Sequence, residues 1–214
     1  MTRPRILMAD DHLLVLASLR KLVEEDGDVV GTIGDGRALL EEAQRLQPDI
    51  ILLDISMPLL NGLDAARKLR TLVPESKLIF VTMHATPTYV AEAFKVGASG
   101  YLIKQSAAAE LKQAIQAVLR GQHYMTPSVT KDTMGAALQP EGPVCKRPAT
   151  ALTPRQREVL QLLAEGKGTR SIASLLQISI KTVEFHRTRL MDELNLHSTA
   201  ELTRYAVSEG LVSL

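Results

Sequence analysis

Five short apolar runs, separated by longer amphipathic stretches, constrain the fold more than any other feature of this sequence. The runs are Ile6–Ala9, Val29–Ile33, Ile50–Leu53, Leu78–Val81 and Tyr101–Ile103. Each run is continuously apolar rather than alternating, which is typical of parallel strands buried on both faces. Helical patterns lie between the runs, near residues 12–26, 36–46, 62–72, 87–97 and 107–120. Five such units predict an α/β, doubly wound, five-stranded parallel sheet with right-handed crossovers.

The chain changes character after residue 121. Residues 122–151 are interrupted by Pro127, Pro140, Gly142, Pro143 and Pro148. This composition predicts a linker, with room for one short helix near 128–138. Residues 152–214 show no strand pattern and predict a small all-α domain of four helices. We therefore expect a first domain over 1–121, a linker over 122–151 and a second domain over 152–214.

Several polar residues mark where helices are expected to begin. Thr153 and Ser198 each stand three residues before Gln or Glu, which is the spacing of a capping box. Thr169 and Ser179 are the predicted N-caps of the two helices between them. Thr86, which precedes a proline, is the predicted N-cap of a helix in the first domain.

Composition argues against several classes of protein. Aromatic residues make up 3% of the chain and Trp is absent, which argues against a stacking platform for single-stranded nucleic acid. The lone Cys145 can form neither an internal disulfide nor a zinc site. No apolar window approaches the roughly 18 residues that suggest a membrane span, and the first apolar run is too short for a signal peptide. We therefore expect a cytoplasmic protein with no membrane partner.

Polar side chains follow four of the five predicted strands. Asp10 and Asp11 follow the first strand, Asp54 the third, Thr82 the fourth and Lys104 the fifth. In open α/β sheets, ligands bind in the crevice at the carboxyl ends of the strands. Taken singly, each residue has an ordinary explanation, such as a helix N-cap or a solvated strand edge. Taken together at four strand ends, they indicate a site.

The chemistry of this set suits phosphoryl transfer onto a carboxylate. Asp54 is the expected nucleophile, because aspartate is known to form aspartyl-phosphate. Asp10, Asp11 and Asp54 offer the hard oxygen ligands that Mg²⁺ prefers. Lys104 supplies a compact cation, and Thr82 a hydroxyl donor, for the oxygens of the transferred group.

The sequence carries motifs that resemble those of a known family. The motifs are Asp54-Ile55-Ser56-Met57-Pro58 with Asn61-Gly62, and Gly97-Ala98-Ser99-Gly100-Tyr101-Leu102-Ile103-Lys104. On these motifs, residues 5–121 resemble the receiver domain of two-component response regulators, a flavodoxin-like fold. Residues 152–214 are similar to the LuxR-type helix-turn-helix domain of the NarL family. The motifs there are Leu152-Thr153-Pro154-Arg155-Gln156-Arg157-Glu158-Val159-Leu160 and Lys181-Thr182-Val183-Glu184-Phe185-His186.

The resemblance implies a role for each receiver residue. Asp54 would be phosphorylated by a partner sensor histidine kinase, with Mg²⁺ as cofactor. Thr82 and Tyr101 would be the switch pair, in which phosphate draws the hydroxyl inward and the ring turns into the vacated space. Ser56 and His84 would control access of the hydrolytic water and so the lifetime of the phosphate.

The implied protein is a transcription regulator rather than an enzyme, although its receiver promotes phosphoryl transfer to its own aspartate and slow hydrolysis. It would act as a homodimer when phosphorylated, with double-stranded DNA as its ligand, and the resemblance also admits RNA polymerase as a partner. Two positions depart from the family. Gln105 stands where many receivers have Pro, which leaves a cis peptide there in doubt. Gly168 stands where a polar residue is usual.

The helix-turn-helix is predicted from two helices near 169–176 and 180–193 and the short turn between them. The expected buried stripe of the second helix consists of Val183, Leu190 and Leu194, with Met191 or His186 beside them. Its opposite face carries Lys181, Thr182, Glu184, Phe185, Thr188 and Arg189. The second helix of such a motif enters the major groove of DNA.

The alternative for this domain is an ordinary helical bundle with a solvated charged face. Residues 146–214 carry 10 Lys and Arg against 7 Asp and Glu, whereas residues 1–125 carry 14 against 15. This mild asymmetry is consistent with nucleic-acid binding. The resemblance favours DNA binding and implies two sets of contacts: bases for Glu184, Phe185 and Thr188, and phosphates for Lys181, Arg187 and Arg189. It also implies a dimer contact on the last helix, near 198–209, through Leu202, Tyr205 and Ala206.

Two other functions are alternatives to a phosphorylation-controlled regulator. A phosphatase with an aspartyl-phosphate intermediate would need a second carboxylate just after Asp54, where Ser56 stands instead. A phosphorylation-independent interaction module joined to a DNA-binding domain would not need the whole set of strand-end residues. The regulator explains both observations.

Overall fold

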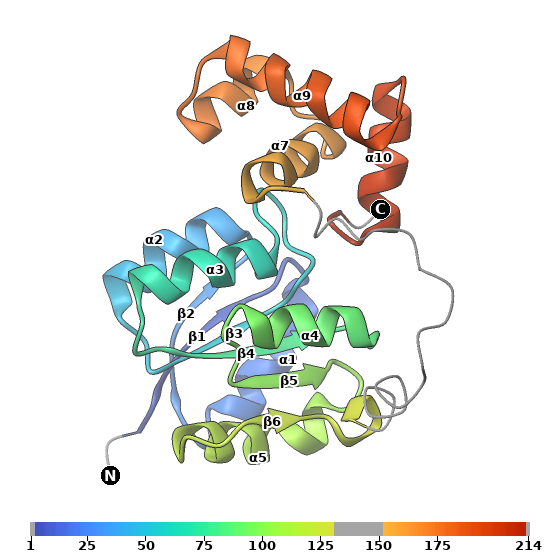
Figure 1. Ribbon diagram of the computed structural model, residues 1–214. Coiled ribbons are helices and arrows are strands. Elements are labelled where there is room, and N and C mark those ends of the chain that lie inside the picture. Colours follow the sequence, from blue (N-terminus) through green and yellow to red (C-terminus); the bar gives the residue numbers. More distant parts are fainter. Residues whose placement is uncertain (1–2, 131–151, 213–214) are drawn as a thin grey trace. The chain divides into compact units, whose positions relative to one another are not determined.

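The computed structural model describes residues 3–130 and 152–212, and the chain divides into two compact units (Figure 1). The N-terminal unit contains the sheet, whereas the C-terminal unit contains helices. Within the two described ranges, no helix combines the length and the apolar character needed to cross a bilayer.

Six parallel strands form the sheet of the N-terminal unit, in the order β2-β1-β3-β4-β5-β6. The strands are β1 (Arg5–Ala9), β2 (Asp28–Ile33), β3 (Ile50–Leu53), β4 (Lys77–Thr82), β5 (Gly100–Ile103) and β6 (Tyr124–Met125). The chain steps from β1 outward to β2 and then back past β1 to β3. The carboxyl ends of β1 and β3 therefore adjoin at the point where the strand order reverses, which is where open α/β sheets bind ligands.

The doubly wound parallel sheet agrees with the sequence prediction, but the predicted number of five strands is wrong. The sixth strand, β6, pairs with β5 through the register Gly100↔Tyr124 and Tyr101↔Met125. It lies in the stretch that the sequence pattern assigns to the linker. A strand of two residues is too short to show a period, and the proline that follows it reads as a breaker.

Five helices cover the two faces of the sheet (Figure 1). They are α1 (Leu13–Val23), α2 (Gly36–Leu46), α3 (Gly62–Leu72), α4 (Pro87–Lys95) and α5 (Ala107–Leu119). Helices α1 and α5 pack together on one face, where Leu16 and Leu111 join the buried strand residues Met8 and Leu52 in one core cluster. Helices α2 and α3 pack together on the other face. The continuous apolar strands are explained by this double cover.

Two predicted features of the N-terminal unit have definite outcomes. Thr86 is the N-cap of α4, as predicted, although its side chain makes no capping hydrogen bond. All peptide bonds among the described residues are trans, including the bond between Lys104 and Gln105. Of the short helix predicted near 128–138, residues 127–130 are helical, and residues 131–138 lie outside the described residues.

The C-terminal unit consists of α7 (Pro154–Ala164), α8 (Thr169–Leu176), α9 (Ile180–Leu194) and α10 (Thr199–Ser208) within its described residues. Both predicted capping boxes are present, at Thr153 and at Ser198. Ser179 is the N-cap of α9, and its hydroxyl accepts a hydrogen bond from the Thr182 N–H. The prediction of Thr169 as a cap is wrong: Gly168 is the N-cap of α8 and has no side chain to accept a hydrogen bond.

The α10 side chains to which the resemblance assigned a dimer contact differ in their burial. Leu202 and Ala206 are fully buried, in one cluster with Val159 and Leu160 of α7. Tyr205 is partly buried against the same cluster, and burial raises its pKa to about 12. Leu202 and Ala206 stabilise the unit itself and offer no surface to a second copy. Tyr205 keeps part of its surface exposed, so a dimer contact through Tyr205 stays a prediction.

Candidate functional site

The structure brings the five predicted strand-end residues to one edge of the sheet. Asp10 and Asp11 follow β1 directly, Asp54 follows β3, Thr82 ends β4 and Lys104 follows β5. Backbone hydrogen bonds hold neighbouring positions in register: Asp54 N–H donates to the Ala9 carbonyl at 2.9 Å, and Lys104 N–H donates to the Thr82 carbonyl at 2.9 Å. The parallel sheet thus places these side chains on a rigid edge.

Lys104 forms the centre of the cluster. Its ammonium nitrogen Nζ lies 2.8 Å from Asp54 Oδ2 and 2.7 Å from Asp10 Oδ2. The Lys104 side chain is only 9% exposed, so these ion pairs are poorly screened by water. An ammonium has three N–H donors, and the two carboxylates use two of them. One donor remains for an oxygen of an incoming group.

Burial and pairing act in opposite directions on the ionisation of this cluster. Burial raises the pKa of Asp10, and the hydrogen bond from Lys104 offsets part of that rise. Burial alone would lower the pKa of Lys104, but the hydrogen bonds to Asp10 and Asp54 outweigh it and the pKa is raised. Lys104 therefore stays charged at neutral pH, as a cation that binds oxyanions must.

The donors next to Lys104 suit a divalent cation that prefers oxygen. Ligand atoms from Asp10, Asp11, His12 and Asp54 all lie within 4.8 Å of one another. Asp11 Oδ1 is buried and accepts no hydrogen bond from any described residue, although His12 Nδ1 lies 2.7 Å away. Carboxylate oxygens of this kind match the preference of Mg²⁺ for hard ligands. The residues present therefore fit the predicted ion.

The backbone after Asp54 turns very tightly. Ile55 N–H donates to Asp54 Oδ1 at 2.6 Å, and Gly62 N–H returns to the Ile55 carbonyl at 2.7 Å. A Cβ atom at Gly62 would lie 1.9 Å from the Asp54 carbonyl oxygen. Only glycine permits this close approach, which fixes the start of α3 beside the phosphoacceptor candidate.

Three further predicted residues, together with Thr82, form a second layer beside Asp54. Ser56 Oγ lies 2.9 Å from His84 Nε2, and His84 N–H donates to Thr82 Oγ1 at 3.4 Å. Tyr101 is fully buried, and its hydroxyl donates to the His84 carbonyl at 2.7 Å. Burial raises the pKa of Tyr101 and lowers the pKa of His84. The structure thus links Ser56, Thr82 and Tyr101 through His84, and the Tyr101 ring already lies inside the fold.

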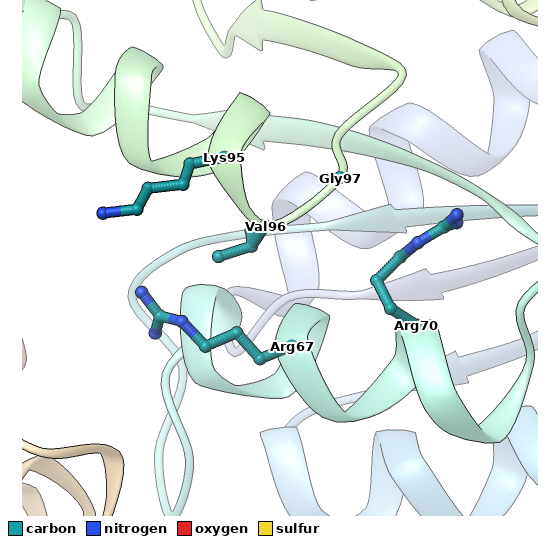
Figure 2. A pocket seen from close by; sticks show the side chains of 5 residues that line it. All are labelled: Arg67, Arg70, Lys95, Val96 and Gly97. Carbon is teal, nitrogen blue, oxygen red and sulfur yellow. The ribbon is translucent and has the colours of Figure 1, made fainter.

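A separate hollow in the N-terminal unit is lined by three cations, but it is not built to bind an anion. Arg67 and Arg70 of α3 and Lys95 of α4 line it, and Figure 2 shows the Arg70 guanidinium directed away from the other two. Arg67 pairs with two carboxylates, of which Glu92 lies 3.0 Å away, and Arg70 donates to the Ser76 carbonyl. These contacts stabilise the α3–α4 side of the fold.

In the C-terminal unit, α8 and α9 form the predicted helix-turn-helix. Gln177 ends α8 in the left-handed region, with φ at 52°, and Ser179 then begins α9. Val183 and Leu190 are fully buried, while Leu194, Met191 and His186 are partly buried. The sequence left Met191 and His186 as alternatives beside the stripe, and the structure places both at its margin.

The opposite face of α9 is open to solvent. Lys181, Glu184, Phe185, Thr188 and Arg189 are exposed, whereas Thr182 and Arg187 are half-buried. The Phe185 side chain is 58% exposed, and Ile180 at the start of the helix is 42% exposed. Exposed apolar side chains among polar ones on a helix suit contact with base edges and thymine methyl groups.

The three predicted phosphate-binding cations differ in their surroundings. Arg189 Nε lies 2.7 Å from Glu193 Oε1, and Arg187 donates to Thr199 Oγ1 at 3.0 Å. Lys181 forms no ion pair with any residue in the described ranges. Arg170, in the first turn of α8, is also exposed and unpaired among the described residues. Arg170 was not among the predicted contacts because it lies on α8, whereas all of the predicted contacts lie on the second helix of the motif.

Comparison with known proteins gives the same two parts. Residues 6–116 match the family model of the response regulator receiver domain, and residues 150–206 match that of the bacterial regulatory proteins of the luxR family. The chain is 35% identical over 211 residues to the transcriptional regulatory protein MctR of Rhizobium johnstonii, covering 98% of this chain and 95% of the relative. It is 33% identical to the oxygen regulatory protein NreC of Staphylococcus carnosus, covering 97% of this chain and 99% of the relative.

Solved structures agree with this result. The response regulator RcsB of Salmonella typhimurium is similar with a TM-score of 0.66 and 28% identity, covering 98% of this chain and 99% of that one. A complex of RcsB with DNA is similar with a TM-score of 0.60 and 27% identity, covering 97% and 99%. The chain therefore belongs to the two-component response regulators of the NarL/LuxR family, with a receiver domain and a LuxR-type DNA-binding domain.

Proposed function

We propose that Asp54 accepts a phosphoryl group from a partner histidine kinase and that this modification controls DNA binding by the C-terminal unit. The observation that carries the proposal is the bridge that Lys104 makes between Asp54 and Asp10, at 2.8 and 2.7 Å, on the edge where Thr82 also ends its strand. One nucleophile, one cation and one hydroxyl within a single cluster suit transfer of an oxyanion onto a carboxylate.

In the proposed transfer, an Asp54 carboxylate oxygen forms a bond to phosphorus while the phosphorus–nitrogen bond to the donor histidine breaks. Lys104 exchanges its contact with Asp54 Oδ2 for an oxygen of the phosphoryl group and keeps its contact with Asp10. The Thr82 hydroxyl accepts from the His84 N–H through a lone pair, so its own proton is free to donate to a second phosphoryl oxygen. Lys104 already contacts Asp54 directly, so its exchange of partners needs little movement.

Asp10, Asp11 and Asp54 would hold Mg²⁺. The ion would offset the negative charge of the three carboxylates and the phosphoryl group. Ser56 and His84 lie in the loops that follow β3 and β4, and we infer that the attacking water of hydrolysis approaches Asp54 past them. Their hydrogen bond at 2.9 Å keeps both side chains in place, so we assign them to control of the phosphate lifetime.

Intact-mass spectrometry with acetyl phosphate tests the site. The wild type should gain one phosphoryl group with Mg²⁺ and none with EDTA, whereas Asp54→Asn should gain none. Asp49→Asn is a matched control, because Asp49 precedes β3 at the opposite edge of the sheet and accepts from the Arg5 N–H at 2.7 Å. Equal labelling of the wild type and Asp54→Asn would refute the assignment.

The second part of the proposal concerns DNA. The exposed face of α9 would enter the major groove, with Glu184, Phe185 and Thr188 toward the bases. Lys181, with Arg187 and Arg189, would contact phosphates, and Thr182 lies at the margin of this face. RcsB, a structural neighbour at 27% identity, has been solved as two dimers bound to two parallel DNAs. This supports a homodimer on DNA, and we infer that phosphorylation favours the dimer and that its DNA site is two-fold symmetric.

Footprinting and sedimentation test the dimer. We expect phosphorylation to shift the chain to a dimer and to protect two half-sites separated by about 10 bp or a multiple of it. Protection of one asymmetric half-site at saturation would contradict this. If Asp54→Asn and phosphorylated wild type bind DNA equally, the receiver acts instead as a phosphorylation-independent interaction module.

A further inference from the structure

Thr126, the residue that follows β6, is bonded to three other parts of the N-terminal unit. It is 2% exposed. Its hydroxyl accepts from the Ile103 N–H at 3.2 Å and donates to Glu110 Oε2 of α5 at 2.8 Å. Its backbone carbonyl accepts from the Thr130 N–H at 3.2 Å, in the helical turn that begins at residue 127. One side chain therefore joins the end of β5 to α5.

The hydroxyl of Thr126 takes the place of a missing main-chain acceptor. Along the side of β5 that faces β6, which we call its outer edge, Tyr124 N–H donates to the Ser99 carbonyl at 3.1 Å and Thr126 N–H donates to the Tyr101 carbonyl at 3.0 Å. The next main-chain donor on this edge is the Ile103 N–H. The chain turns into a helix at this point, so the Thr126 carbonyl faces Thr130 instead of Ile103. The side-chain oxygen then satisfies a buried N–H that would otherwise lack a partner.

The residue held in this way, Ile103, directly precedes Lys104. On the inner edge of β5, the side that faces β4, Lys104 N–H donates to the Thr82 carbonyl at 2.9 Å. On the outer edge, Thr126 holds Ile103, and the Ser106 hydroxyl donates to the Ile103 carbonyl at 3.1 Å. The backbone that carries Lys104 is thus fixed from both sides. A small rotation there would move the ammonium away from Asp54, because the side chain extends four carbons from the backbone.

We propose that Thr126 is a positioning residue for Lys104 and sets the rate at which Asp54 is phosphorylated. The inference rests on the proposed function of Asp54. Thr126 touches neither the phosphoryl group nor the metal ligands, so it acts only through the Ile103–Lys104 backbone. Its loss should slow phosphoryl transfer, while the carboxylates that bind Mg²⁺ stay in place.

The test compares Thr126→Val, Thr126→Ser and Thr130→Val in the full chain. Valine has the shape of threonine without the hydroxyl, whereas serine keeps the hydroxyl. Thr130→Val makes the same change four residues later, where the hydroxyl donates only to the Thr126 carbonyl at 3.3 Å. The initial rate of labelling by acetyl phosphate is measured by intact mass across a Mg²⁺ titration, and urea unfolding is recorded for each variant.

At saturating Mg²⁺, Thr126→Val should be labelled about fivefold to tenfold more slowly than the wild type. Its half-saturating Mg²⁺ concentration should be unchanged, and Thr126→Ser and Thr130→Val should match the wild type. A wild-type rate for Thr126→Val, no rescue by serine, or an equal loss in Thr130→Val would overturn the inference. A higher half-saturating Mg²⁺ concentration for Thr126→Val would also overturn the inference, because it would show a general loosening of the site.

Glu110→Ala provides a second variant in case Thr126→Val does not fold. It removes the acceptor of the Thr126 hydroxyl, and Tyr124→Phe is its control, because Tyr124 donates to the same carboxylate at 3.3 Å but does not touch Ile103. Slower labelling of Glu110→Ala alone supports the inference, and equal rates in the two variants contradict it. A wild type that takes no label would instead refute the proposed function of Asp54.

Discussion

Ser56 Oγ and His84 Nε2 lie 2.9 Å apart, although 28 residues separate them in the sequence. The bond joins the loop after β3 to the loop after β4, beside Asp54. His84 also stacks on Tyr89, with ring centroids 4.3 Å apart, so the imidazole has little freedom to move. The two residues assigned to control of the phosphate lifetime therefore act as one unit.

We expect Ser56→Ala and His84→Gln to change the decay of the phosphorylated form more than its formation. Each variant opens a path for water, so decay should be faster. Because the two side chains are bonded, the double variant should show a coupling energy of about 0.5–3 kcal/mol in the decay rate rather than simple addition. The measurement is the loss of phosphorylated mass after the donor is removed. Decay rates like that of the wild type in both single variants would contradict the assignment.

The close approach of Gly62 to Asp54 predicts a large effect of adding one methyl group. Gly62→Ala would place Cβ 1.9 Å from the Asp54 carbonyl oxygen and 3.0 Å from Ile55 Cα, both of them backbone atoms. We expect a loss of about 1–3 kcal/mol in the free energy of unfolding, because the turn must shift. Gly34→Ala is the control: nothing lies within 4 Å of its added Cβ, so its effect should stay within about 0.5 kcal/mol. Urea unfolding of both variants measures the two changes in the free energy of unfolding.

The sequence predicts most of the site because its residues occupy strand ends. Asp10, Asp54 and Lys104 each follow a continuous apolar run, and parallel strands bring such positions to one edge. Periodicity carries this information without any tertiary contact. The sequence also predicts the exposed face of α9, since Val183 and Leu190 define the opposite, buried side.

The features that the sequence did not predict depend on single contacts rather than on periods. Thr126 reads as part of a linker because a proline follows it, yet its hydroxyl completes the edge of β5. The burial of Leu202 and Ala206 results from packing of α10 on α7, which no local pattern reveals. Gly168 lacks the side chain that marks an N-cap, so the sequence assigned the cap to its neighbour.

His186 predicts a dependence of stability on pH. Its pKa is lowered, first by burial and then by Arg155 and Arg189, and its Nδ1 atom accepts no hydrogen bond from the described residues. The unfolded chain, with a pKa near the usual value of about 6.5, therefore takes up the proton first as the pH falls. Stability should be complete above about pH 6.5 and be lost progressively as the pH drops through the folded-state pKa.

His186→Gln should reduce this acid loss, because glutamine does not titrate. Urea unfolding of the full chain between about pH 5 and pH 8 measures it. An NMR titration of the imidazole in the folded chain gives the second observable, and its midpoint should lie below about 6.5. An identical pH dependence of stability in the variant and the wild type would show that another group is responsible.

The predicted phosphate-binding cations of α9 differ in whether they have a partner. Lys181 has no ion-pair partner among the described residues, whereas Arg189 lies 2.7 Å from Glu193. Lys181→Ala should therefore weaken binding to all DNA alike and reduce the log–log salt slope by about 0.9 for one phosphate contact. Arg189→Ala should change the slope less, because that arginine must leave Glu193 before it can neutralise a phosphate.

Glu184 should behave differently, since its exposed carboxylate can accept a hydrogen bond from cytosine N4. Glu184→Ala should relax the preference at one base position by about 1–3 kcal/mol while leaving the salt slope nearly unchanged. Removing a carboxylate also removes repulsion from the phosphates, so affinity for scrambled DNA should rise slightly. Binding isotherms on cognate and scrambled duplexes at several salt concentrations measure all three variants. The base-reading role is wrong if Glu184→Ala keeps the cognate-to-scrambled ratio, and the phosphate role is wrong if Lys181→Ala collapses that ratio.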